Sequence, residues 1–558
     1  MQIYYYCNSE RKQMLNQAGQ DYTPAYIPEL LSVLGVSAVP IDTQGLLDGV
    51  LGTQDILLTG NEALPEGFRA DCTHIAFQTS GELSAFGIEY ESEIPKTGDK
   101  YDIDGYCYCD IAGRQLPLPV ISSFAVVRPQ GAETLAFAQA GERRVPAFLA
   151  CAEKYYFTFD LPATVWYAGD GRPLSEGKGG FPLGRLPDTR VMPLSYDTRI
   201  AYSDCYAFLL QTIFRRHGVP MLHRLPPLED GGAPDLLLYF AGDDDAGSAE
   251  NDLKASAAMA QRGLPYHLNA MPADTQGHFV IDREQQEELL RRGCEVALHP
   301  NFVGISEYSE EGYRLQADMF ERAFGRKAVS AVNHCLIQQG SCAERLRFQE
   351  KQGILGDNNK MGEIDESDIN AFNLSGYAFG TSFPRFTLDD AAHGNARINV
   401  VEIPITYYEP RLYSRSPEEL DKLHSYIDQC VFWGRVGSLF FHPHYISGVV
   451  GPAEPALAAL DECMAYCDAK GYKVYKTAPD ALTLWWHDRA ASRICEISPN
   501  GFVLDCAAES LSLLMPEGTV DVYVDGVKAN TEQKALEGGV STLLTVKGRG
   551  RHTIAYAV

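Results

Sequence analysis

Between residues 236 and 444 the chain repeats one pattern, a short apolar run that ends on a carboxylate, a histidine or an asparagine. Helical segments such as "DREQQEELLRRG" lie between several of these runs, so the pattern predicts parallel strands joined by helices. Many such units favour a barrel, in which chemistry gathers at the carboxyl ends of the strands. The predicted strands are "LLLYFAG", "LPYHLNAM", "CEVALH", "VSAVNH", "QGILGD", "YAFGTSF", "VVEIPI" and "SLFFHPH".

Two further regions flank this pattern and differ from it. Residues 1–190 alternate predicted strands, such as "MQIYYYC" and "DILLTG", with helices, which favours a parallel-sheet α/β domain. Residues 488–558 contain "GTVDVYVDGVKAN" and other strand-like runs with turn signals, so we expect a small β-sandwich there. Residues 191–487 form the predicted central barrel. The expected fold class is therefore α/β, with a distorted (β/α) barrel between an α/β domain and an all-β domain.

Size and charge limit the functions that the chain can have. A length of 558 residues exceeds what one core supports, which agrees with about three domains. The formal net charge of -27 argues against nucleic acid and anionic membranes as partners, because phosphate binding needs clustered Lys and Arg. No apolar run approaches the roughly 18–20 residues of a membrane helix. The start "MQIYYYCNSERKQ" predicts a strand rather than a secretory signal.

The cysteines bear on the compartment. The chain has 14 Cys and no CxxC pair. A protein of this length does not need disulfides for stability, so we expect reduced, mostly buried thiols and a cytoplasmic location.

The polar strand ends are the candidate site. Three adjacent carboxylates, Asp243 to Asp245, repel one another, and they indicate either a solvated loop or a bound cation. Histidines follow three other predicted strands, and Asp and His are the usual protein ligands of a divalent ion such as Zn²⁺. Four strand ends of this kind in one barrel favour a metal site. The candidate residues outside the acidic triplet are His299, Asn333, His334, Asp357, His442 and His444.

On these residues, the region from about 235 to 487 resembles the polysaccharide deacetylases of carbohydrate esterase family 4. That family has an Asp-Asp pair after its first strand, in which the first Asp is the catalytic base and the second is a metal ligand. Counting back without gaps from "RGLPYHLN" places the pair on Asp244 and Asp245, which leaves Asp243 as an extra residue. The resemblance thus implies Asp244 as the base.

Two of the family's motifs depart from its pattern. "RRGCEVALHPNFV" keeps His299 as a metal ligand but has Val303 where the family has a second histidine. "VNHCLIQQG" replaces the third motif, and we infer that His334 supplies the missing ligand. Asp357 lies in the region of the fourth motif, and "SLFFHPHYIS" places His442 at the position of the general acid.

The resemblance implies metal-assisted hydrolysis of an N-acyl, most simply N-acetyl, amino sugar. The implied cofactor is a divalent ion, Zn²⁺ first and Co²⁺, Ni²⁺ or Mn²⁺ as alternatives. The implied partner is a carbohydrate, contacted by Asn333, Asp357, Asn358 and His444.

Two alternatives stay open. A glycoside hydrolase on a related barrel would use Asp244 with Asp357 or Glu402 as its two carboxylates. A non-catalytic carbohydrate-binding protein on this scaffold would be compatible with Val303.

The N-terminal region resembles, faintly, the class I glutamine amidotransferase-like fold. Catalytic members need a cysteine at a sharp strand-to-helix turn, and Cys107 in "DGYCYCD" does not follow an apolar strand. We therefore expect a non-catalytic domain that shapes the site or forms a homo-oligomer.

Overall fold

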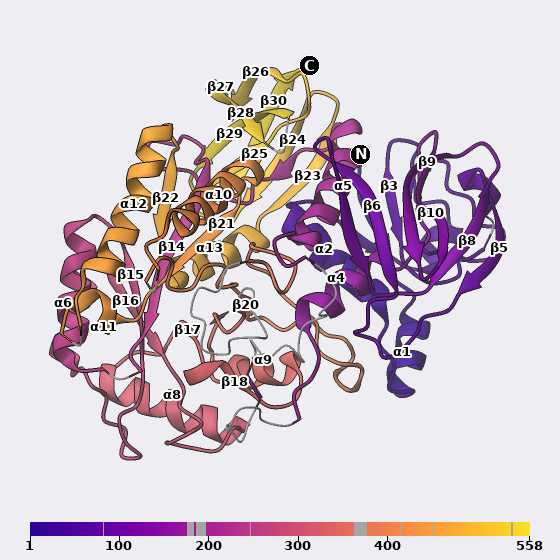
Figure 1. Cartoon of the computed structure of the whole chain (residues 1–558). Coiled ribbons are helices and arrows are strands. Elements are labelled where there is room, and N and C mark those ends of the chain that lie inside the picture. The colour runs from indigo at the N-terminus through magenta and orange to yellow at the C-terminus, as the bar shows by residue number, and fades with distance from the viewer. Residues whose placement is uncertain are drawn as a thin grey trace.

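The computed structural model describes residues 1–81, 83–175, 184–185, 197–245, 247–361, 376–412, 414–449, 451–536 and 539–558. Three parts with their own apolar cores organise the described residues, and Figure 1 shows the N-terminal sheet on the right, the central sheet on the left and the C-terminal strands at the top. No helix in these ranges is long and apolar enough to cross a membrane.

The N-terminal sheet is mixed, whereas the sequence predicts a parallel one. Its first five strands pair in parallel, and the last four are antiparallel. The hairpin between β6 and β7 turns at Ala112 and Gly113, whose φ values of 51° and 77° suit the right-handed twist of the strands. In spatial order the strands are β2 (Val39–Ile41), β1 (Ile3–Tyr6), β3 (Ile56–Thr59), β4 (Thr73–Phe77), β11 (Lys154–Phe157), β10 (Arg143–Cys151), β9 (Glu133–Ala140), β6 (Gly105–Ile111) and β7 (Arg114–Val120).

Helices lie on both faces of this sheet, because α2 shares a core with Ile56 and Leu58 of β3, whereas Leu46 of α3 packs with Leu57 on the other face. In the segment "TPAYIPELLSVLG", α2 (Ile27–Leu34) ends at Gly35 with a left-handed φ of 73°. A side chain at Gly35 would overlap the carbonyl of Leu222, so only glycine fits there. The other elements of this part are α1 (Ser9–Gln17), η1 (Thr23–Tyr26), α3 (Thr43–Leu47), η2 (Leu83–Phe86), α4 (Leu161–Asp170) and the β5–β8 pair (Ile88–Ile94 and Phe124–Pro129).

The central sheet is a curled, parallel half-barrel. It closes irregularly, because Glu409 N donates to Phe440 O (2.8 Å) and Tyr408 bridges to the same residue, Phe440. In spatial order its strands are β20 (Val401–Glu402), β19 (Gly356–Asp357), β17 (Ser330–Ala331), β16 (Cys294–Leu298), β15 (Tyr266–Ala270), β14 (Leu236–Asp243) and β21 (Val436–Phe440), with β22 (Val474–Thr477) beside the start of β14.

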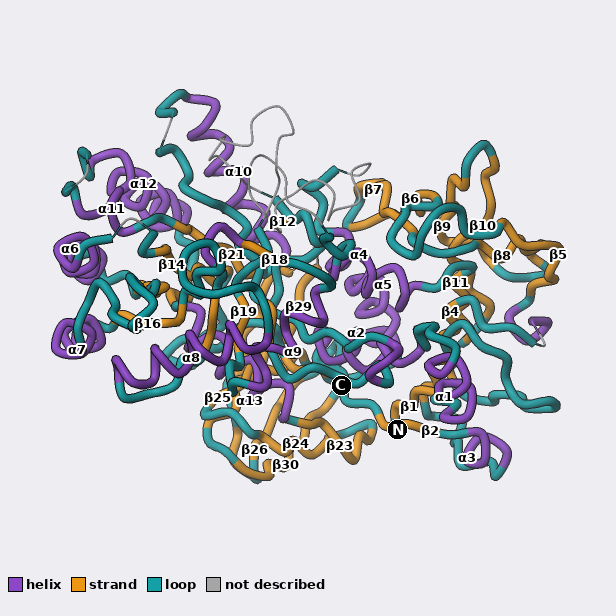
Figure 2. Tube along the Cα trace, turned by 90° about the horizontal axis from the view of Figure 1, so that it is seen from below, coloured by secondary structure: helices purple, strands orange, loops and turns teal. Residues whose placement is uncertain are grey.

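Helices surround the outside of this sheet in both views (Figures 1 and 2). They fold where the sequence provides caps, as at Asp282, which forms a reciprocal capping box with Gln285 before α7. The helices are α6 (Ala249–Gln261), α7 (Arg283–Arg291), α8 (Glu310–Phe324), η3 (His334–Leu336), α9 (Cys342–Lys351), η4 (Ala391–His393), α10 (Pro417–Trp433), α11 (Pro443–Ser447), α12 (Glu454–Lys470) and α13 (Pro479–Ala491).

Strand β14 is buried on both faces, and the two faces belong to different cores. Leu236, Leu238 and Phe240 join the core under the outer helices. Leu237, Tyr239 and Ala241 join the core inside the barrel. Because side chains alternate along a strand, odd-numbered residues here point inward and even-numbered residues point toward the helices.

The C-terminal part consists of two antiparallel sheets over a shared apolar core. One of them includes β13 (Met221–Leu222), and α5 (Tyr202–Arg216) packs in the N-terminal core, so residues 201–222 contact both flanking parts. The predicted domain boundaries stay predictions. The strands are β23 (Arg493–Ser498), β24 (Gly501–Cys506), β30 (Gly550–Ala557), β26 (Val520–Val524) and β27 (Val527–Lys528) in one sheet, and β25 (Ser510–Leu514), β29 (Gly539–Lys547) and β28 (Thr531–Leu536) with β13 in the other; β12 (Gly184–Arg185) pairs with β18 (Ile337–Gln338).

Candidate functional site

Asp245 lies at the centre of a histidine cluster at the carboxyl edge of the half-barrel. Its Oδ1 is 2.9 Å from His299 Nε2, and its Oδ2 is 3.2 Å from His442 Nε2. His334 Nε2 is 3.7 Å from Asp245 Oδ1. Asp243 Oδ2 lies 3.8 Å from His299 Nε2. The three predicted metal ligands Asp245, His299 and His334 are therefore brought together, with Asp243 and His442 beside them.

Each of two imidazoles is oriented through its Nδ1 atom. His299 Nδ1 is 2.6 Å from the carbonyl oxygen of Val332, and His442 Nδ1 is 2.6 Å from Glu409 Oε1. Such partners hold the ring in one orientation and direct Nε2 toward the cluster. Burial alone would lower the pKa of His442, but hydrogen bonds to Asp245 and Glu409 raise that pKa well above its usual value.

Left-handed backbone occurs next to this cluster at residues other than glycine. Cys335 and Leu336, which follow His334, have φ values of 57° and 52°. Glu409 has a φ of 44°. Such conformations are costly for residues with a Cβ and persist where the surrounding structure holds them, often at functional sites. Glu409 is not among the residues predicted from the sequence, although it follows an apolar run, "VVEIPITYY", in the same way as the other candidates.

Asp244, the predicted base, is not part of the cluster. Asp243 lies 3.8 Å from His299 and Asp245 contacts His299 and His442, whereas no hydrogen bond or ion pair among the described residues joins Asp244 to a histidine. Neither oxygen of its carboxylate has a hydrogen-bond partner, and a side chain at Gly247 would overlap Asp244 Oδ1. The structure thus brings Asp243, which the gapless count left as an extra residue, to the histidines, and the role of Asp244 as the base stays a prediction.

Three of the predicted substrate-binding residues are turned into the protein. Asn333 is fully buried, accepts from Tyr313 Oη (2.8 Å) and donates to the carbonyl of Ile337 (2.7 Å). Asn358 donates to the carbonyl of Ile403 (2.5 Å). Asp357 accepts two hydrogen bonds from the guanidinium of Arg345 (3.1 Å each). These side chains are committed to internal hydrogen bonds, so the structure does not place them where a sugar could contact them.

His444 remains beside the cluster. It lies on α11, half-buried, with its ring centroid 5.3 Å from that of His442. Burial and then the charge of His442 lower the pKa of His444 to about 4, which keeps its ring neutral. Val303, where the resembled family has a ligand, is about half exposed and offers no donor atom.

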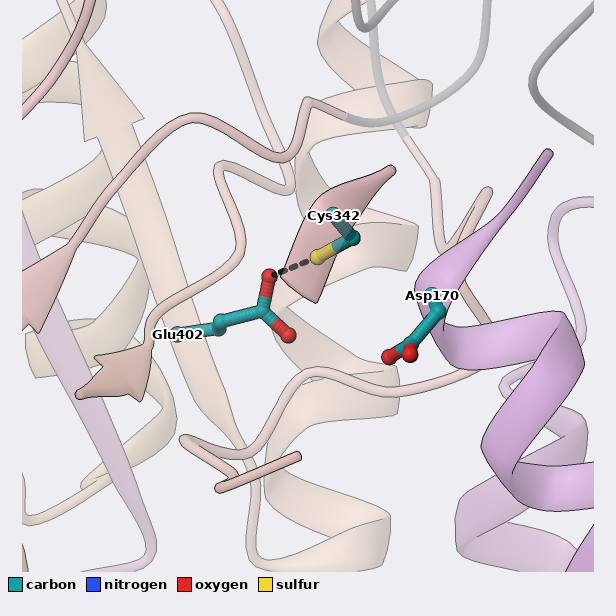
Figure 3. A group of neighbouring side chains, drawn as sticks. All are labelled: Asp170, Cys342 and Glu402. Atoms are coloured by element: carbon teal, nitrogen blue, oxygen red, sulfur yellow. Dashed lines mark hydrogen bonds between the residues drawn. The ribbon is translucent and has the colours of Figure 1, made fainter. Parts of the chain in front are cut away.

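A second group of candidate ligands lies where α4 meets the half-barrel. Asp170, Cys342 and Glu402 are buried, and their side chains point toward one another (Figure 3). Cys342 Sγ donates to Glu402 Oε1 (3.0 Å). This group nevertheless already has cations of its own. Lys360 Nζ is 2.7 Å from Glu402, and Arg385 is 2.5 Å from Asp170 and 3.0 Å from Glu402.

Arg345 extends this network to Asp357. Its guanidinium donates to both carboxylate oxygens of Asp357 (3.1 Å each) and to Glu402 (3.0 Å). Three carboxylates thus face three side-chain cations, so no metal ion is needed for neutrality. Burial alone would raise the pKa of Glu402, but Lys360, Arg385 and Arg345 together lower it to about 2. Asp357 and Glu402 are therefore locked in ion pairs, which disfavours them as the acid and base of a glycoside hydrolase.

Two other groups in the described residues have local roles. Glu295 accepts hydrogen bonds from His267 and from the first backbone N–H groups of α13, and Arg347 contacts the exposed group at Asp389 and His393. The remaining group, at Asp245, offers imidazole Nε2 atoms and carboxylate oxygens together. Those are the donors that a Zn²⁺ site takes, so the residues present fit a divalent ion of this kind.

No family model matches this chain, and no curated protein matches it. Solved structures do match part of it. A Mycobacterium smegmatis protein described as a polysaccharide deacetylase is 15% identical over 48% of this chain and 96% of its own, with a TM-score of 0.32. The catalytic domain of a peptidoglycan N-acetylglucosamine deacetylase from Eubacterium rectale is 12% identical, covering 44% of this chain and 89% of its own, with a TM-score of 0.24. A chitin deacetylase from Colletotrichum lindemuthianum is 10% identical, covering 43% and 85%, with a TM-score of 0.25.

These neighbours are deacetylases, but similarities with TM-scores this low do not by themselves assign an activity. None of these comparisons supports the predicted resemblance of residues 1–190 to glutamine amidotransferases. In the structure Cys107 lies inside β6, fully buried, with its Sγ 3.3 Å from Cys109 Sγ, rather than at a strand-to-helix turn.

Proposed function

We propose that this chain is a metal-dependent hydrolase that removes an N-acyl group, most simply N-acetyl, from an amino sugar. The observation that carries the proposal is the position of Asp245 between two buried histidines, His299 and His442. His334 lies 3.7 Å from Asp245, and Asp243 lies 3.8 Å from His299. Asp245, His299 and His334 would hold the ion, which is Zn²⁺ in the simplest case. When bound, such an ion supplies Lewis-acid activation of water and of the acyl carbonyl.

The chain's own side chains would move the protons. Asp243 is the proposed base, because its Oδ1 is held by Asn269 Nδ2 (3.0 Å) while Oδ2 faces the histidine cluster. His442 is the proposed acid, because Glu409 keeps a proton on Nδ1 and Nε2 faces the cluster. Nε2 of His442 would donate a proton to the leaving amine. His444 would contact the sugar as a neutral ring.

The reaction is tested with purified protein and chito-oligosaccharides. We expect release of acetate without new reducing ends, loss of that activity after chelation, and its return on adding Zn²⁺. New reducing ends without acetate would instead identify a glycoside hydrolase. Neither product, with metal bound at the site, would leave a carbohydrate-binding protein as the answer.

The third metal ligand is tested by titrating Zn²⁺ into three variants. His334→Ala is expected to weaken metal binding about as much as His299→Ala, because catalytic zinc sites usually have three protein ligands. His442→Ala is expected to bind nearly as well as the wild type and to lose turnover. Normal binding by His334→Ala together with loss in His442→Ala would contradict this, since His442 also lies 3.2 Å from Asp245. The ligand would then come from the end of β21, and the acid would need another assignment.

A further inference from the structure

Two buried carboxylates near the start of α6 have no hydrogen-bond partner. Asp244 follows β14, and Asp252 lies on α6; each is only 1% exposed. All four of their carboxylate oxygens lack a hydrogen-bond partner. Burial first, and the charge of Asp252 second, raise the pKa of Asp244 to about 9.

The Asp244 carboxylate lies against Gly247, just before α6, and Asp252 is in the first turn of that helix. A side chain at Gly247 would overlap Asp244 Oδ1, so this carboxylate occupies the space that the glycine leaves open at the start of α6. Asn251, next to Asp252, accepts from Ser447 Oγ of α11 (2.8 Å), which holds α6 and α11 together beside this space. The neighbouring Tyr266 Oη already donates to the carbonyl of Phe441 (2.7 Å).

Such a pair is unstable unless something neutralises it. An unpaired buried carboxylate costs several kcal/mol, and a second one close by adds repulsion. The buried acids at Glu402 are matched by three cationic side chains. Among the described residues, no Lys, Arg or His forms an ion pair with Asp244 or Asp252. Either a bound cation or shared protons must therefore compensate.

We infer that Asp244 and Asp252 bind a hard cation such as Ca²⁺, at a site separate from the histidine cluster. Both groups offer only oxygen, and hard cations take oxygen ligands, whereas the cluster on the inner face offers imidazole nitrogen. Adjacent residues of one strand end would thus serve two ions on opposite faces. The outer cation would tie α6 to the segment that carries Asp243 and Asp245. This inference does not depend on the proposed hydrolase activity.

The test uses the full-length protein after chelation and follows thermal unfolding while CaCl₂ is added. The wild type is expected to show a midpoint that rises with Ca²⁺ concentration, because a ligand that binds only the folded state stabilises it. Asp252→Asn is expected to lose this rise. Glu250→Gln, an exposed acid on the same helix, is the matched control and is expected to keep it. His299→Ala is also expected to keep it, since that variant damages only the histidine cluster.

Isothermal titration of Ca²⁺ into wild-type protein already loaded with Zn²⁺ covers the case in which Asp252→Asn fails to fold. One additional Ca²⁺ per chain is expected. A wild type that neither binds Ca²⁺ nor changes its midpoint with Ca²⁺ would overturn the inference and leave a proton-sharing carboxyl pair. Loss of the Ca²⁺ response in His299→Ala would also overturn it, because the ion would then occupy the cluster.

Discussion

Asp243→Asn is expected to lower deacetylation turnover by about 10²–10⁴, the usual contribution of a general base. The amide has nearly the same shape, so the hydrogen bond with Asn269 and the packing at the end of β14 can persist. It cannot accept a proton from water. Because Asp245 and the histidines are untouched, metal content is expected to stay near that of the wild type. Turnover at saturating substrate and metal analysis of the same preparation provide the check.

Asp244→Asn is the matched comparison for this experiment, one residue away on the same segment. We expect a smaller loss of turnover than in Asp243→Asn, because neither oxygen of the Asp244 carboxylate forms a hydrogen bond with a histidine. If Asp244→Asn causes the larger loss, the assignment implied by the gapless count is right. Asp244 would then be the base, and its carboxylate would have to turn toward the histidine cluster when substrate binds.

Glu402→Gln is expected to destabilise the fold by about 3–5 kcal/mol, the typical cost of breaking a buried ion pair by removing one partner. Glu402 contacts Lys360, Arg345 and Arg385, and all four side chains are almost fully buried. Without its charge, three cations face only Asp170 and Asp357. The excess positive charge would be buried where α4 of the N-terminal part meets β20, so that contact is expected to loosen first.

Urea unfolding followed by circular dichroism measures this effect. Since the chain has several cores, unfolding need not be two-state, and the midpoint of the first transition is the quantity to compare. Glu310→Gln is the control, because Glu310 pairs with Lys351 at the surface (2.6 Å) and such pairs contribute little. Equal midpoints for Glu402→Gln and Glu310→Gln would mean that the network does not stabilise the contact between these parts.

The amino-acid sequence was sufficient to predict most parallel strands of the central region and the gathering of Asp245, His299, His334 and His442, although "YAFGTSF" forms turns and bends instead of a strand. That prediction works because carboxyl ends of parallel strands share one edge of a sheet, whatever the details of packing. Both flanking regions were also expected, although the antiparallel half of the N-terminal sheet was not. Its hairpin turn requires a left-handed Ala112, a residue that does not signal such a turn in a sequence.

Only the tertiary structure decided which side chains face inward. "LLLYF" is apolar at every position because β14 is buried on both faces, so no alternation in the sequence reveals which of Asp243, Asp244 and Asp245 point into the barrel. Asn333 and His334 follow β17, and there Asn333 bonds to Tyr313 and Ile337 inside the protein while His334 lies beside Asp245. Asp357 was predicted to contact substrate, but in the structure it forms a buried ion pair with Arg345. Pairings such as Arg345 with Asp357 and Glu409 with His442 join separate segments, and a sequence pattern carries no information about contacts that form only when those segments pack together.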